Sequence, residues 1–321
     1  MESPVSTAAS GRRMLRIASF TLVAAALLAA GFVVARDRMP RTREAADRRL
    51  RVVASFYPLY FFASKIGGDA AIVFNVTPAG AEPHEYELTP QDLVRIETSD
   101  LVLLNGLDFE PWGNRILADQ QNQLPGVITV GEEAAILYKT GDGGRILNPH
   151  VWLSPPLARR MIEVIVEAFV SLDAARAEGF RANAAALQMR LTELDTAYRL
   201  GLRACRLRDI ITSHAAFGYL AAEYGFNEIP IAGVSTDDEP SAREIADIAA
   251  FAKRNGITHI FFESLTSPEL AKTIAEEAGA KTLALNPLEG LTDAEITEGK
   301  DYITEMTQNF HNLQIALHCL P

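Results

Sequence analysis

Cysteine and histidine are scarce in this sequence. Its 321 residues include only two cysteines, Cys205 and Cys319, and six histidines. Two thiols are too few for a thiolate zinc site of the finger kind. An oxidising compartment permits a disulfide between them, which would hold the C-terminus in place, and two separate buried thiols are the alternative. No cysteine lies near the apolar segment that ends at Ala35, so we do not expect a lipid to be attached there.

The chain also lacks an excess of positive charge. Its formal net charge is −11, and residues 1–36 contribute +3 of positive charge, which leaves −14 for the remainder. Nucleic-acid-binding proteins usually carry a basic patch, so we do not expect nucleic acid as a partner. The sequence contains no His-Glu-x-x-His, no Gly-x-Ser-x-Gly and no phosphate-binding loop, and we therefore do not expect an enzyme.

The N-terminus has the pattern of an export signal. Arg12, Arg13 and Arg16 precede an uncharged apolar stretch from Ile17 to Ala35, with small residues at its end. We interpret residues 1–36 as a signal peptide, with an uncleaved membrane anchor as the alternative, and residues 37–49 as a charged linker. Export of a chain without a lipid anchor indicates a periplasmic location.

Short apolar strands alternate with helical segments from Leu50 onwards, and each strand is apolar throughout. That pattern is typical of an α/β fold with parallel sheets covered on both faces. We predict two such lobes, at residues 50–156 and 205–321. The predicted strands are 51–56, 71–76, 100–105, 126–130, 209–212, 228–232, 258–262 and 281–285.

Residues 157–204 separate the two lobes and are almost wholly helix-forming, with one break near residues 171–174. The second piece, residues 175–203, would be about 40 Å long. A helix of that length can link two lobes as a stiff rod.

Three histidines occur in turn-like contexts far apart in the sequence. They are His84, His150 and His214, and no local helix can bring them together. A single loop histidine is most often exposed or a helix cap. His214, however, directly follows a predicted strand, as do Glu263 and Asn286, and ligands of open parallel sheets bind at the carboxyl ends of the strands. We therefore expect a cleft between the lobes in which three imidazoles hold a divalent metal.

The motifs around these histidines resemble those of a known family. Asn148-Pro-His150-Val-Trp-Leu-Ser-Pro155, Ser213-His214-Ala-Ala-Phe-Gly-Tyr219 and Glu239-Pro-Ser241 are together similar to the metal-binding solute receptors of ABC transporters, the cluster 9 or cluster A-I receptors. The resemblance covers residues 50–320. It implies a two-lobed receptor with a rigid linking helix, which binds one metal ion between its lobes and delivers it to a membrane permease. We expect a monomer.

The same resemblance implies the ligand set. His84, His150 and His214 fall on the first three ligand positions, and the third histidine favours Zn²⁺ over Mn²⁺ or Fe²⁺. Asn286 falls on the fourth position, where many members have aspartate, so the fourth ligand could instead be water, Glu82 or Glu85. Glu263 would orient an imidazole or form a surface ion pair. The alternatives are a Mn²⁺ or Fe²⁺ receptor of the same family, or a metal-binding adhesin or metallochaperone that serves no permease.

Overall fold

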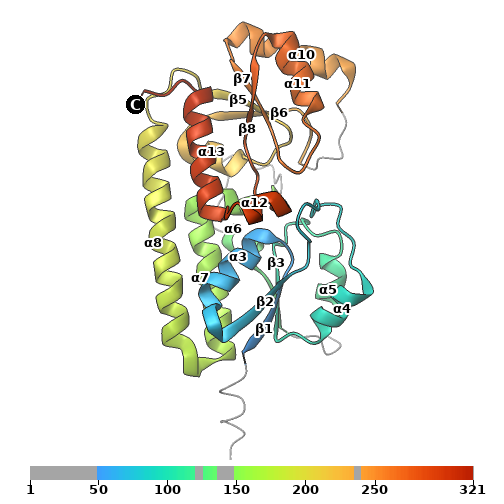
Figure 1. Ribbon diagram of the computed structural model, residues 1–321, viewed down its shortest axis with the longest axis vertical. Helices are drawn as coiled ribbons and strands as arrows, with labels where there is room; N and C mark the ends of the chain where they lie inside the picture. Colours follow the sequence, from blue (N-terminus) through green and yellow to red (C-terminus); the bar gives the residue numbers. More distant parts are fainter. Residues whose placement is uncertain (1–48, 120–125, 136–147, 235–239, 321) are drawn as a thin grey trace, which may run out of the picture. The chain divides into compact units, whose positions relative to one another are not determined.

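Two separate four-stranded parallel sheets form the framework of the protein (Figure 1). The structure is a computed structural model that describes residues 49–119, 126–135, 148–234 and 240–320. The expected signal peptide or anchor, the linker up to residue 48 and the motif residue Glu239 lie outside these ranges. In the described part of the chain, no helix is long and apolar enough to cross a membrane.

The first sheet has the strand order β2-β1-β3-β4. All three strand pairings in it are parallel, and Val52, Val53 and Ala54 of the second strand in that order are fully buried. Burial on both faces explains why these strands read as continuous apolar runs. The strands are β1 (Leu50–Ala54), β2 (Ala71–Asn75), β3 (Leu101–Leu104) and β4 (Gly126–Thr129).

The second sheet repeats this arrangement with the order β6-β5-β7-β8, again with parallel pairings. Each predicted strand is present, with bounds that differ by at most two residues. The strands are β5 (Asp209–Thr212), β6 (Asn227–Pro230), β7 (His259–Phe262) and β8 (Lys281–Ala284). The predicted α/β fold class with two parallel sheets is therefore confirmed.

Helices cover both faces of each sheet, and residues at their ends stabilise several of them. Thr89 caps α4 with a reciprocal hydrogen-bonded pair to Asp92, and Gly256 ends α10 in the left-handed conformation. The helices around the sheets are α3 (Tyr57–Gly67), α4 (Pro90–Glu97), α5 (Gly113–Asp119), α6 (Val130–Ala135), α9 (Gly218–Tyr224), α10 (Ala242–Asn255), α11 (Glu269–Ala278), α12 (Asp293–Thr297) and α13 (Tyr302–Ala316).

Helix α9 begins at Gly218, so residues 215–217 between His214 and this helix are not helical. The Ala215 N–H donates to Gly233 O and the Phe217 N–H donates to the Glu228 carboxylate, so these donors are used outside a helix. These two contacts fasten the turn that follows His214 at the end of β5.

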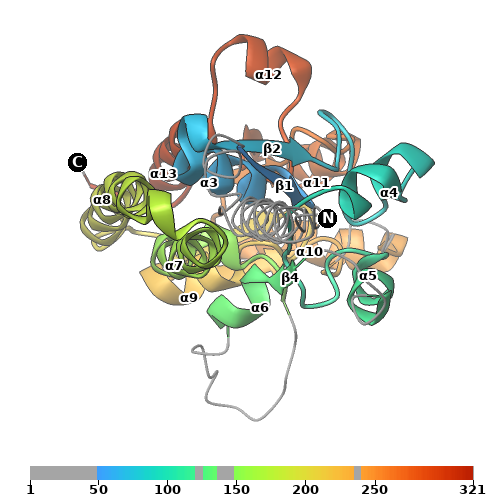
Figure 2. The same cartoon turned by 90° about the horizontal axis from the view of Figure 1, so that it is seen from below.

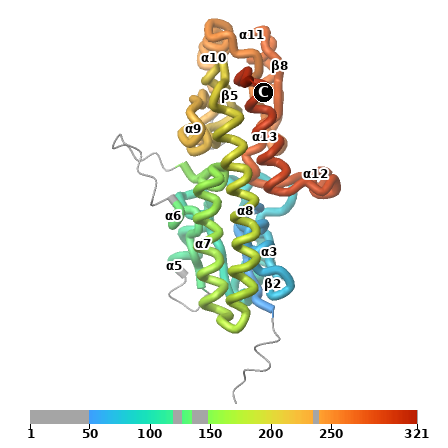
Figure 3. The backbone as a smooth tube through the Cα atoms, turned by 90° about the vertical axis from the view of Figure 1, so that its left-hand side faces the viewer, coloured from blue at the N-terminus to red at the C-terminus, as the bar shows by residue number. Residues whose placement is uncertain are grey.

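Two long helices connect the sheets. Helix α7 (Pro155–Leu172) is followed by α8 (Ala177–Gly201), which has 25 residues and is about 38 Å long. Helix α8 packs against α7 and α3 and, further along, against α13 (Figures 2 and 3). The Asn183 amide donates to Ile66 O, and the Tyr198 hydroxyl donates to Met306 O. The largest apolar core accordingly continues from β1 through α7 and α8 to α13. The division into lobes at residues 156 and 205 stays a prediction.

A disulfide joins Cys205, which follows α8, to Cys319, which follows α13. The two cysteines also pair as an isolated antiparallel bridge, and the Leu207 N–H donates to Leu317 O beside it. Of the two alternatives left open by the sequence, the structure forms the bridge rather than two separate thiols.

Candidate metal centre

Four side chains from distant parts of the sequence converge at one point. His84, His150, His214 and Glu289 each present one ligand atom, and these atoms all lie within 4.8 Å of one another. We call this group the His3Glu cluster. His84 lies in the loop between β2 and α4, and His150 lies at the start of the short 3₁₀ helix η3 (Val151–Leu153). His214 follows β5, and Glu289 follows β8.

Five of the six separations between the ligand atoms of the His3Glu cluster are 2.9–3.5 Å, and all six are within 4.8 Å. Nε2 of His150 lies 3.3 Å from Nε2 of His84 and 3.2 Å from Nε2 of His214. Oε1 of Glu289 lies 2.9 Å, 3.2 Å and 3.5 Å from Nε2 of His150, His214 and His84. The centre of a regular tetrahedron with edges of about 3.3 Å is about 2.0 Å from each corner, which is the length of a Zn–N or Zn–O bond.

A neutral amide fixes the orientation of His150. Its Nδ1 lies 2.8 Å from Asn148 Oδ1, an oxygen that can only accept, so the ring proton lies on Nδ1 and the Nε2 lone pair faces the cluster. Asn148 is itself held, because its Oδ1 accepts from the His150 N–H at 3.0 Å and its amide donates to Ala215 O at 2.7 Å.

A carboxylate fixes the orientation of His214. Oε1 of Glu263, directly after β7, lies 2.8 Å from His214 Nδ1, and Glu263 is only 3% exposed. This arrangement orients the imidazole and makes it a stronger ligand. Of the two roles considered for Glu263, the structure therefore places it against the imidazole and not at the surface.

Glu82 and Glu85 lie beside the His3Glu cluster but are not members of it. Glu82 Oε1 accepts from the His84 N–H at 3.3 Å. Both glutamates line a cavity of about 440 Å³, which Ser213, the neighbour of His214, also lines. Burial, followed by the charge of Glu289, raises the pKa of Glu82 to about 9, so this carboxyl is neutral at pH 7.

Asn286 occupies a different place from the one the sequence suggested. Its Oδ1 accepts from the Leu288 N–H at 2.8 Å, and its Nδ2 donates to Ser264 and Glu305. The carboxylate that reaches the three imidazoles is that of Glu289, three residues later, which sequence reasoning missed. The signal available in the sequence was an acid three residues after Asn286, in Asn286-Pro-Leu-Glu289.

The other three histidines lie outside the His3Glu cluster. His259 belongs to β7, as predicted, and its Nδ1 is 2.9 Å from the Thr258 hydroxyl. The same hydroxyl lies 2.8 Å from Nε2 of His318. His311 is exposed on α13.

In the metal-free cluster, the surrounding charges keep a proton on His214. Burial lowers the pKa of His150 to about 4, so this imidazole is neutral at pH 7. Burial also acts to lower the pKa of His214, but the charges of Glu289 and Glu263 raise it well above its usual value. Burial acts to raise the pKa of Glu289, yet the imidazoles hold it well below its usual range. Thus a protonated His214 lies between two carboxylates, whose negative charge also favours a divalent cation at this point.

Comparisons with known proteins give one consistent result. The family described as zinc-uptake complex component A, periplasmic (ZnuA) matches residues 52–316. The zinc-binding lipoprotein AdcA of Streptococcus pneumoniae R6 is 37% identical over 284 residues, which cover 84% of this chain and 56% of that protein. The high-affinity zinc uptake system protein ZnuA of Bacillus subtilis is 35% identical over 290 residues, covering 86% of this chain and 91% of that protein.

A solved structure has the same fold. The Zn(II)-bound ZnuA-like domain of Streptococcus pneumoniae AdcA aligns with a TM-score of 0.74 and 36% identity, and the alignment covers 84% of this chain and 99% of that domain. The chain spans about half the length of the streptococcal relative.

Proposed function

We propose that this chain, which belongs to the ZnuA family of periplasmic zinc-uptake components, is the receptor that captures Zn²⁺ for an ABC importer. In this proposal the His3Glu cluster binds one Zn²⁺ outside the cytoplasmic membrane, and a membrane permease receives it. The names of the relatives, the matched residues and the expected export segment at residues 1–36 support this assignment.

The observation that carries the proposal is the donor set. The set consists of three imidazole nitrogens and one carboxylate oxygen. Five of the six distances between these atoms are 2.9–3.5 Å, which suits a four-coordinate tetrahedral ion. Zn²⁺ accepts such a set, whereas Mn²⁺ prefers six oxygen-rich ligands. We therefore propose Zn²⁺ and not Mn²⁺ or Fe²⁺ as the transported ion.

The connectivity suggests how the ion could be released. His84 and His150 precede α7, whereas His214 and Glu289 follow α8. A relative movement of the two sheets would separate one pair of ligands from the other and weaken all the bonds to the metal together. We propose that docking on the permease favours this separation.

Single histidine substitutions test the assignment. We expect His84→Ala, His150→Ala and His214→Ala each to weaken Zn²⁺ binding by more than about 100-fold, because a tetrahedral site with three ligands must recruit water in place of an oriented imidazole. Competitive titration of the metal-free protein with a chromophoric chelator, repeated with Mn²⁺, provides the measurement. His311→Ala, which changes an exposed histidine of α13, is the matched control and should bind like the unchanged protein. Unchanged affinity in all three cluster variants, or a preference for Mn²⁺, would refute the proposal.

Zinc affinity should depend on pH in one direction. The raised pKa of His214 means that the metal-free protein carries a proton there, and Zn²⁺ must displace it. Affinity should therefore rise about tenfold for each pH unit through neutrality, and should fall more steeply still as pH approaches about 4, where His150 also gains a proton. Chelator competition between about pH 5.5 and 8, corrected for protonation of the chelator, measures this slope. A flat profile would show that no proton is held at the cluster.

A further inference from the structure

The turn that carries Glu289 has an unusual backbone. Leu288, the residue before it, has a φ of +56° and is fully buried. Residues with a side chain rarely adopt this left-handed conformation, and they keep it only where the surrounding structure holds them there. Such backbone positions are concentrated at functional sites. The question is therefore what holds residues 286–289 in place.

Asn286 holds the turn from within. Its side-chain oxygen accepts from the Leu288 N–H at 2.8 Å, which closes a local turn over Pro287. The side chain of Asn309, on α13, also holds the backbone of Asn286. It accepts from the Asn286 N–H at 2.8 Å and donates to the Asn286 carbonyl at 2.6 Å. The start of the turn is thus fastened both to itself and to a neighbouring helix.

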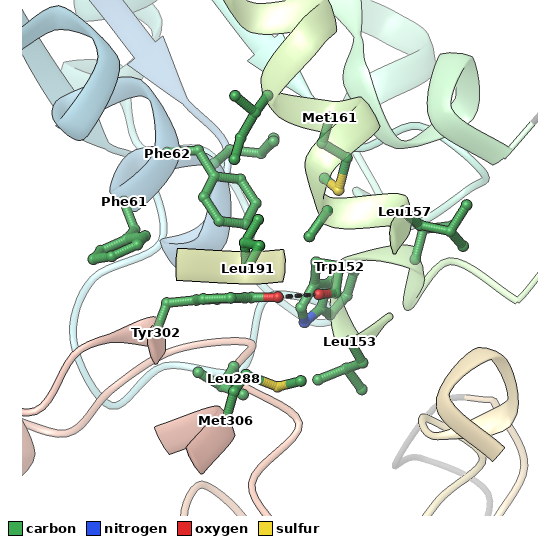
Figure 4. Close-up of a cluster of buried hydrophobic side chains, with 14 of the residues drawn as sticks. Phe61, Phe62, Trp152, Leu153, Leu157, Met161, Leu191, Leu288, Tyr302 and Met306 are labelled. Carbon is green, nitrogen blue, oxygen red and sulfur yellow. Dashed lines mark hydrogen bonds between the residues drawn. The ribbon is translucent and has the colours of Figure 1, made fainter. Parts of the chain in front are cut away.

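Trp152 holds the turn from the other side. Its indole Nε1–H donates to Pro287 O at 2.7 Å, in a fully buried environment. The carbonyl of Trp152 accepts from the Tyr302 hydroxyl, as Figure 4 shows. Trp152 comes two residues after His150, and the centroids of their rings lie 5.1 Å apart. One side chain therefore connects the segment of the second histidine to the segment of Glu289.

The carboxylate of Glu289 depends on this backbone for its position. Its Oε1 contacts only the three imidazoles in the hydrogen bonds and ion pairs found within the described residues, and its buried Oε2 has no partner there. Outside the cluster, the Glu82 carboxyl is a further neighbour of the Glu289 carboxylate. The turn determines where the backbone of Glu289 lies, and so from where its side chain reaches the imidazoles.

We propose that Asn286 and Trp152 are positioning residues, which hold Glu289 at the fourth corner of the His3Glu cluster and so set the preference for a four-coordinate metal. This inference rests on the proposed function and extends it to selectivity. A carboxylate on a fixed turn leaves the cluster tetrahedral and small. A carboxylate on a loosened turn would move outward, admit water, and suit an ion with six oxygen ligands better.

The main test compares Asn286→Ala with a control at another buried asparagine. Asn312→Ala is that control, because Asn312 is also a buried asparagine and donates to Ala284 O of β8 at 2.8 Å without touching the turn. Both variants should lower the thermal midpoint of the metal-free protein. Only Asn286→Ala should weaken Zn²⁺ binding, by about 10- to 100-fold, while Mn²⁺ affinity changes by less than about threefold. The Zn²⁺/Mn²⁺ selectivity ratio should therefore fall by at least about threefold.

Two further variants test the direction of the effect. Asn286→Ser keeps an oxygen that can accept from the Leu288 N–H, so it should recover part of the lost Zn²⁺ affinity. Trp152→Phe keeps an aromatic ring but leaves Pro287 O without its donor, and should weaken Zn²⁺ binding by about five- to tenfold. In both Asn286→Ala and Trp152→Phe, the absorption of bound Co²⁺ should shift from the intense bands of a tetrahedral ion towards the weak bands of a six-coordinate one.

The results separate this inference from the proposed function. If the unchanged protein does not bind Zn²⁺, or binds it without the three histidines, the proposed function fails. If the unchanged protein binds Zn²⁺ through those histidines, but Asn286→Ala shows the same selectivity and Co²⁺ spectrum as Asn312→Ala, the proposed function stands and the positioning role is wrong. A loss of Zn²⁺ affinity in Asn312→Ala as large as in Asn286→Ala would also overturn the positioning role.

Discussion

Zinc affinity will fall by more than about 100-fold when Glu289 is changed to glutamine. The substitution keeps the shape of the side chain but removes the negative charge that lies 2.9–3.5 Å from three imidazoles. A neutral amide oxygen is a weaker ligand for a divalent cation than a buried carboxylate. The variant should be measured by chelator competition at constant pH and ionic strength.

The pH profile of Glu289→Gln provides a second measurement. Apart from burial, which lowers it, the strongest influence on the pKa of His214 is the charge of Glu289. Without that charge the pKa of His214 should fall, so the variant should show a weaker rise of zinc affinity with pH than the unchanged protein. Glu263→Gln is the comparison. Its amide oxygen can replace the carboxylate oxygen that lies 2.8 Å from His214 Nδ1 and can still accept from that nitrogen. It should lose only about 10- to 100-fold in affinity. Equal losses in the two variants would argue against Glu289 as a direct ligand.

Removal of the disulfide will have the largest effect on stability. The bridge between Cys205 and Cys319 closes a loop with a sequence separation of 114 residues. The chain-entropy model predicts a stabilisation of up to about 5 kcal/mol for a loop of this length, and removal of native disulfides typically costs about 2–5 kcal/mol. We expect the Cys205→Ser/Cys319→Ser double variant to lose this amount, which lowers the thermal midpoint by roughly 3–9 °C.

The stability measurement should use metal-free protein, because bound zinc would stabilise the native state by mass action. A reducing agent should lower the midpoint of the unchanged protein and leave that of the double variant unaltered. Zinc affinity should be similar in both proteins, since the hydrogen bonds that hold the His3Glu cluster involve neither cysteine. A double variant as stable as the oxidised protein would show that the bridge contributes nothing in solution.

Much of the fold was predictable because it depends on local chemistry. Continuous apolar runs such as Leu101–Leu104 form strands buried on both faces, and Thr89 and Gly256 bound helices through their own hydrogen bonding and backbone preference. The start of α9 at Gly218 was not predictable in this way. The Phe217 N–H is taken by Glu228, a residue of another strand, and no local rule contains that contact.

The metal centre was predictable only in part. The positions of His84, His150 and His214 after strands or in turns, and their motifs, indicated a shared site. The sequence left the fourth position open between Asn286, which matches a ligand position of the family, and water, Glu82 or Glu85. The turn over Pro287, closed by the Asn286 side chain, instead carries the chain three residues further before a carboxylate faces the imidazoles.

The sequence by itself therefore determined the α/β elements, the two-sheet organisation, the family and three residues of the cluster. These properties follow from periodicity, caps and motifs that act within a few residues. Only the tertiary structure decided that Glu289 is the fourth member, that Glu263 and Asn148 orient the imidazoles, and that Cys205 meets Cys319. The Glu263 and cysteine contacts join residues on different elements, and the position of Glu289 depends on a left-handed backbone at Leu288. Asn148 is only two residues from His150, but its own side chain is held by Ala215 O in a distant part of the chain. Such geometry is set by how the whole chain packs.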